Sequence, residues 1–88
     1  MPQHTIVVRN SSGLHARPAA VFVKTAKGFP NTKIEISKGD VTKDAKSIVG
    51  VLTLAVTKGT EITIRTSGED EDAALKALVD AIESGLGE

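Results

Sequence analysis

One stretch organises this 88-residue chain: Gly13-Leu14-His15-Ala16-Arg17-Pro18-Ala19-Ala20. Gly13 permits a tight approach of the backbone. Pro18 suits the first turn of a helix, where its missing N–H leaves no intrahelical hydrogen bond unmade. Apolar residues then recur at helical spacing, at Ala19, Phe22, Val23 and Ala26. The pattern predicts a loop that ends at His15 and a helix over about 16–27, with Gly28 at its C-cap.

The predicted helix start favours the binding of an anion. The backbone N–H groups of Ala16 and Arg17 would have no intrahelical partner there, and the positive end of the helix dipole lies at the same place. Arg17 adds a planar guanidinium that suits phosphate oxygens. A neutral imidazole beside such a site predicts that His15 itself carries a phosphoryl group, because its ring nitrogen can attack phosphorus. The alternative is a histidine that only caps the helix.

The remaining pattern indicates short strands and one further clear helix. Strands are predicted over 4–9, 32–37, 41–43 and 61–66, with a turn at 38–40. The segment 47–56 is apolar almost throughout, and its pattern alone leans toward a strand. Ser67-Gly68-Glu69-Asp70 has the S-x-x-D form of a capping box before a last helix. The core residues of that helix are predicted to be Leu75, Leu78, Val79, Ile82 and Leu86.

Composition narrows the class of protein. The net charge is zero, which argues against a dedicated nucleic-acid-binding protein. Residues 1–60 carry nine Lys or Arg and three Asp or Glu, whereas residues 61–88 carry two and eight. This asymmetry favours a basic face that attracts an acidic protein partner, and the alternative is that the charges only solvate the surface.

Several kinds of site and of cellular location are not expected. The chain has no cysteine, and His4 with His15 lacks a third metal ligand at a recognisable spacing. It also has no membrane-spanning apolar run and no signal-peptide pattern. We therefore expect a cytoplasmic protein that binds no metal, no cofactor and no membrane.

The stretch around His15 closely resembles the active-site signature of HPr, the family of histidine-containing phosphocarriers of the bacterial sugar phosphotransferase system. A second block, Lys46-Ser47-Ile48-Val49-Gly50-Val51-Leu52, is similar to the regulatory-serine region of the Gram-positive members. Val49 and Leu52 stand where methionines are expected, and His15 and Ser47 are one residue further apart than in that form. The resemblance extends over residues 1–88 as a single domain.

The resemblance implies a short helix from Ser47 to Leu52 or Thr53. The element order is then βαββαβα, which predicts an α+β open-faced β-sandwich. In this fold a four-stranded antiparallel sheet carries three helices on one face.

The resemblance also implies a monomeric phosphocarrier that is not an enzyme. His15 would accept a phosphoryl group, on Nδ1, from enzyme I and pass it to IIA components of sugar permeases, while Arg17 and the Ala16 N–H hold the phosphoryl oxygens. A docking surface is implied at Ala20, Lys24, Lys27, Ile48, Val49 and Leu52.

Ser47 has two interpretations. It can cap a helix, because its hydroxyl can accept a hydrogen bond from an early helical N–H. It can also be a phosphorylation site, whose partners would be an HPr kinase/phosphorylase and a catabolite-control regulator. The alternatives to a sugar-system carrier are a regulatory binding module that acts through Ser47, and a nitrogen-regulatory version of the same carrier.

Overall fold

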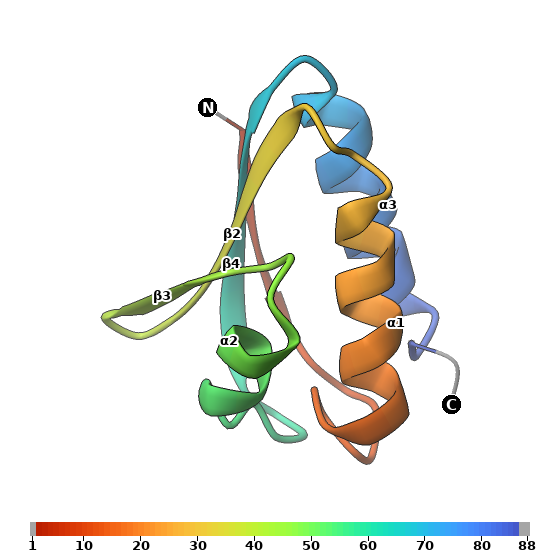
Figure 1. Ribbon diagram of the computed structural model, residues 1–88. Coiled ribbons are helices and arrows are strands. Elements are labelled where there is room, and N and C mark those ends of the chain that lie inside the picture. The colour runs from red at the N-terminus through yellow and green to blue at the C-terminus, as the bar shows by residue number, and fades with distance from the viewer. Residues whose placement is uncertain (1, 87–88) are drawn as a thin grey trace.

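The elements follow one another as β1-α1-β2-β3-α2-β4-α3 in the computed structural model, which describes residues 2–86 (Figure 1). The strands are β1 (Gln3–Val7), β2 (Thr32–Lys38), β3 (Val41–Asp44) and β4 (Glu61–Gly68). The helices are α1 (Ala16–Lys27), α2 (Ile48–Thr53) and α3 (Glu71–Glu83). Both the predicted bounds of α1 and the short helix after Ser47 are confirmed. No helix in this part of the chain is long and apolar enough to span a bilayer.

The four strands form one antiparallel sheet in the order β1-β4-β2-β3. Figure 1 shows α1 and α3 side by side against one face of this sheet, while α2 packs against α1 and β3. Alternate residues of the central strands point into this layer and meet apolar residues of the helices. The buried residues at its centre include Ile34, Ile36, Ile62, Ile64, Phe22 and Leu78. The predicted open-faced α+β sandwich is therefore confirmed.

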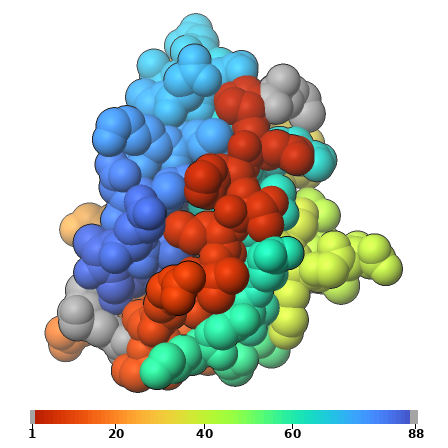
Figure 2. Space-filling view, turned by 180° about the vertical axis from the view of Figure 1, so that it is seen from behind, coloured from red at the N-terminus to blue at the C-terminus, as the bar shows by residue number. Residues whose placement is uncertain are grey.

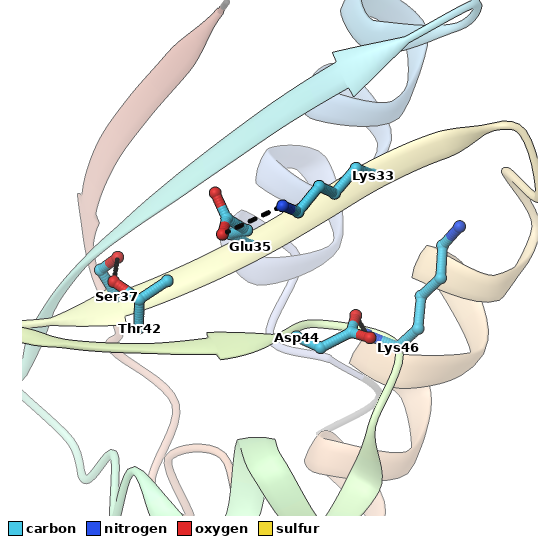
Figure 3. Close-up of polar contacts among 6 residues, drawn as sticks. All are labelled: Lys33, Glu35, Ser37, Thr42, Asp44 and Lys46. Carbon is cyan, nitrogen blue, oxygen red and sulfur yellow. Dashed lines mark hydrogen bonds and ion pairs between the residues drawn. The ribbon is translucent and has the colours of Figure 1, made fainter.

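The opposite face of the sheet is polar. Thr5, Thr63, Ser37 and Thr42 stand in register across all four strands. Their hydroxyl groups pair at 2.9 Å between Thr5 and Thr63 and at 2.8 Å between Ser37 and Thr42. Figure 3 shows the second of these pairs, together with the contact between Lys33 and Glu35 on the same strand. Cross-strand hydroxyl pairs of this kind stabilise a sheet without a covering layer.

The first strand ends earlier than its sequence predicts. β1 stops at Val7, because Val8 no longer pairs with β4. Instead, the Val8 N–H donates to Thr60 O at 2.9 Å, and the Gly59 N–H donates to Val8 O at 2.7 Å. The apolar side chain of Val8 is buried, which is why the sequence pattern extends the strand to this position.

The predicted capping box before α3 is wrong. Ser67 belongs to β4, and the N-cap of α3 is Asp70, whose side chain makes no capping hydrogen bond. The Asp70 N–H donates to Thr32 Oγ1 at 3.1 Å, while Glu71 Oε1 accepts from the Gly68 N–H at 3.3 Å. The pairing of β4 with β2 extends to Gly68 and removes Ser67 from the helix start.

The five predicted core residues of α3 differ in their burial, and one of them lies beyond the end of the helix. Leu78 and Ile82 are buried as predicted, whereas Leu75 and Val79 are half-buried. Leu86 is buried but lies beyond the helix, because the left-handed Gly85 at φ +90° ends it. The Leu86 N–H donates to Ala81 O at 3.0 Å and the Gly85 N–H to Ile82 O at 3.1 Å, which is a Schellman motif.

Candidate functional site

The loop that carries His15 is fastened at several points. Asn10 and Gly13 close a turn, in which the Gly13 N–H donates to Asn10 O at 3.2 Å and Asn10 Nδ2 donates to Gly13 O at 2.9 Å. Leu14 is fully buried, and its N–H donates to Val56 O at 3.0 Å. Figure 2 shows this part of the chain beside the segment that follows α2, at the lower end of the molecule. The two segments together hold the chain just before His15.

Gly13 makes this close approach feasible. Its φ is +61°, which a residue with a side chain adopts only at a cost. A Cβ atom on Gly13 would overlap Val56 O and would lie 2.7 Å from the Cα of Thr57. The glycine that the sequence assigns to a tight approach therefore meets a backbone 43 positions further along the chain.

His15 occupies the N-cap of α1 in an extended conformation, with φ −126° and ψ 158°. Its side chain is half-buried and makes no capping hydrogen bond, so the structure does not support the helix-capping interpretation. The next residue, Ala16, has a φ of +51°, in the left-handed region. The backbone thus turns sharply after His15 and leaves the imidazole at the helix start without a capping role.

The first turn of α1 has no negative charge of its own. The first turn contains no acidic residue, while Arg17 is exposed within it. The ion pairs among residues 2–86 join Lys33 to Glu35 and Lys76 to Asp80, so neither engages Arg17. The early N–H groups of a helix have no intrahelical partners. The site therefore combines a positive helix end, a guanidinium and an imidazole, a set that suits a dianionic phosphoryl group.

Ser47 is the N-cap of α2, and its Oγ accepts the Gly50 N–H at 3.1 Å. The predicted capping role is thus confirmed. The serine is half-buried. A Cβ built on Gly50 would lie 3.4 Å from both Ser47 Oγ and the Cβ of Lys43, so this side of α2 faces β3.

The remaining predicted residues lie on the other side of α2 and on α1. A shallow groove of about 310 Å³ runs between the two helices, and we call it the docking groove; it is lined by Ala20, Val23, Lys24, Lys27 and Ile48. Val49 and Leu52 do not line it, but they lie on the same short helix with 67% and 39% of their surface exposed. Ile48 is 40% exposed. The structure therefore brings Ala20, the two lysines and Ile48 together, whereas His15 and Arg17 lie at the start of the same α1.

The contacts of the segment 54–60 were not expected from the sequence. Val56 and Thr57 pack on the His15 loop, and Ala55 has a left-handed φ of +54° at the end of α2. Alanine gives no local signal for such a conformation, and the partners are far apart along the chain. Among residues 2–86, no group of three or more His, Cys, Asp and Glu side chains is arranged to hold a metal ion.

Comparison with known proteins identifies relatives over nearly the whole chain. The family model described as PTS HPr component phosphorylation site matches residues 2–84. Phosphocarrier protein HPr of Xylella fastidiosa is 41% identical over 88 residues, which is 100% of this chain and 98% of that protein. HPr-like protein Crh of Bacillus subtilis is 45% identical over 78 residues, which is 89% of this chain and 91% of that protein.

A solved structure is similar to the whole fold. The crystal structure of HPr-C-His from Thermoanaerobacter tengcongensis has a TM-score of 0.96 and 46% identity, and the match covers 100% of this chain and 98% of that chain. Multiphosphoryl transfer protein of Salmonella typhimurium is 45% identical over 85 residues, but this chain spans only 22% of its length.

Proposed function

The chain belongs to the PTS-HPr family, and from that premise we propose that His15 carries a phosphoryl group between proteins of the phosphotransferase relay. The resemblance noted in the sequence is thereby confirmed. Members of the family are phosphocarriers and not enzymes. The observation that carries the proposal for this chain is the position of His15, at the uncapped start of α1 and two residues before Arg17.

The transfer exchanges one P–N bond for another. The neutral imidazole of His15 attacks the phosphorus of a phosphohistidine on enzyme I, the donor P–N bond breaks, and the donor imidazole leaves with the bonding electron pair. The N–H groups of Ala16 and Arg17 and the Arg17 guanidinium hold the phosphoryl oxygens as their charge redistributes. A second exchange of the same kind passes the group to a IIA component.

The docking groove, with Val49 and Leu52, is proposed as the surface that meets both partners. Its exposed aliphatic side chains lie beside Lys24 and Lys27. Apolar residues flanked by positive charge are suited to a partner that presents apolar residues within an acidic rim. The position of this surface along α1 would allow a partner to contact it and His15 together.

Regulation through Ser47 is a second proposal, and the relationship to Crh, described as the catabolite repression HPr of B. subtilis, supports it. Ser47 stands directly before Ile48 and so at the edge of the docking groove. A phosphate there would place roughly −1.5 to −2 charges beside a surface suited to acidic partners. The kinase/phosphorylase and the catabolite-control regulator belong to this proposal.

We also propose that the carrier is cytoplasmic and monomeric. A crystal structure of an HPr dimer from T. tengcongensis is among the relatives. Sedimentation of this chain across the micromolar range therefore checks the monomer directly, because a dimer would raise the sedimentation coefficient with concentration.

Labelling with phosphoenolpyruvate and enzyme I tests the proposed function. The wild type is expected to incorporate one phosphoryl group, and His15→Ala none. His4→Ala is the matched control, because His4 is the other histidine of the chain and lies exposed on β1. Circular dichroism checks that both variants fold. Label retained in His15→Ala, or lost in His4→Ala alone, would refute the proposal.

A further inference from the structure

Helix α2 is too short to hold its own position. It contains six residues, and an isolated helix of this length is unstable in water. Val51 is its single buried residue, and Leu54 follows at the C-cap with 4% exposure. Three of the other residues, Ile48, Val49 and Leu52, turn to solvent. The place of α2 in the fold therefore depends on contacts made by other parts of the chain.

A lysine ammonium fixes the chain just before α2. Lys46 Nζ donates to Phe29 O at 2.7 Å and to Thr32 O at 2.6 Å. Phe29 directly follows the C-cap of α1, and Thr32 is the first residue of β2. Figure 3 shows the Lys46 side chain extending away from Asp44 toward this connection, while its backbone N–H donates to Asp44 Oδ1 at 2.9 Å. The beginning of α2 is thus tied to the end of α1.

A second lysine ammonium fixes the other end of α2. Lys38 Nζ, from the end of β2, donates to Leu54 O at 3.1 Å and to Ala55 O at 3.0 Å. The last carbonyl groups of a helix lack intrahelical donors and lie at the negative end of its dipole, so a cation there satisfies both needs. Each ammonium makes two hydrogen bonds to backbone carbonyls, and bonds from an ionised donor are stronger than neutral ones.

We propose that Lys38 and Lys46 are positioning residues that hold the two ends of α2 and thereby set the docking groove between α1 and α2. Ile48, which lines the groove, is two residues from Lys46. Loss of the two hydrogen bonds made by either ammonium would let α2 move relative to Lys24 and Lys27. The consequence for docking rests on the proposed function, whereas the positional claim concerns the free protein alone.

Hydrogen exchange of the free protein tests the positional claim without a partner protein. Lys38→Met and Lys46→Met retain an unbranched, apolar side chain and remove the ammonium. Exchange of the Val51 and Leu54 amides, which bond to Ser47 O and Val51 O, is expected to accelerate about tenfold or more, as expected for the loss of two charge-assisted bonds. The central amides of β4 are expected to keep their wild-type rates.

Lys33→Met is the matched control. Lys33 lies on the same strand as Lys38 and loses the same charge, but its side chain is 75% exposed and forms an ion pair with Glu35 at 3.9 Å. This variant is expected to leave α2 exchange unchanged. The proposal would be overturned if the α2 amides of Lys38→Met and of folded Lys46→Met exchanged at the wild-type rate, as those of Lys33→Met are expected to do. Should Lys46→Met fail to fold, Lys38→Met decides the question.

Steady-state transfer from phospho-enzyme I separates positioning from chemistry. Both methionine variants are expected to raise the KM for the donor protein about three- to tenfold relative to Lys33→Met, with kcat retained, because the two ammonium groups bind neither His15 nor Arg17. A fall in kcat at unchanged KM would contradict the positioning role. A wild type that accepts no phosphoryl group would refute the proposed function alone, since the exchange result would still decide the positional claim.

Discussion

The backbone of Gly13 lies directly against the carbonyl of Val56. A Cβ on Gly13 would overlap that oxygen, which accepts the neighbouring Leu14 N–H at 3.0 Å. Gly13→Ala must therefore adopt a left-handed φ and also displace the segment after α2. We expect it to lower the free energy of unfolding by about 1–3 kcal/mol more than a left-handed alanine does in open space.

Gly39→Ala supplies the comparison for this prediction. Gly39 has nearly the same φ, +59°, but no atom lies within 4 Å of a Cβ built on it. Its substitution is expected to cost only the backbone strain, about 1–2 kcal/mol. Urea unfolding of both variants gives the difference. Equal losses would mean that the contact between Gly13 and Val56 contributes nothing.

Ala55→Gly is expected to stabilise the protein. Ala55 has a φ of +54° at the end of α2, where glycine adopts the conformation without strain. The gain is about 0.5–1 kcal/mol after the larger entropy of the unfolded glycine chain is subtracted. Thermal unfolding measures it. Ala77→Gly makes the same chemical change inside α3 and is expected to destabilise by about 0.5–1 kcal/mol.

Arg17→Ala is expected to slow phosphoryl transfer by about 100-fold, the scale for loss of one donor to a charged transition state. Affinity for enzyme I should change little, because Arg17 does not line the docking groove. Arg17→Lys should recover only part of the rate, since an ammonium lacks the planar fork. Single-turnover transfer and calorimetric titration separate the two quantities, and an unchanged rate in Arg17→Ala would remove the residue from the mechanism.

Ser47→Asp is expected to weaken binding of enzyme I by ~1–3 kcal/mol, the scale for a poorly paired charge at an interface. The helix should tolerate it, because aspartate is a good N-cap and can replace Ser47 Oγ as acceptor of the Gly50 N–H. Ser47→Ala reverses the pattern: it loses the cap, at about 0.5–2 kcal/mol of stability, but should still dock. Calorimetry and thermal unfolding of both variants check this. Unchanged affinity in Ser47→Asp would leave only the capping role.

Local signals in the sequence predict much of this fold. α1 begins and ends where Pro18, Gly28 and Pro30 require it, and the alternating residues of β2 and β4 identify their buried face. The segment of α2 could not be assigned from its pattern, because it is apolar on nearly all sides yet partly exposed. Its helix was predicted only through the resemblance to HPr.

Contacts between distant parts of the chain explain what the sequence does not predict. His15 and Arg17 are recognisable because one helix start holds them both. The contacts of Gly13 with Val56, and of Lys46 with Phe29 and Thr32, join segments that only the folded chain brings together. Ser67 illustrates the same limit, since the pairing of β4 with β2 prevails over a local capping pattern.

Identifying the atom that carries the phosphoryl group is the most direct test of the central claim. The protein, labelled with ¹⁵N on histidine and phosphorylated by phosphoenolpyruvate and enzyme I, can be examined by ¹⁵N–³¹P correlation spectroscopy. We expect a single coupled signal, from Nδ1 of His15, which vanishes in His15→Ala and persists in His4→Ala. A phosphoryl group on His4 or on Ser47 under these conditions, or none on a folded wild type, would contradict the account.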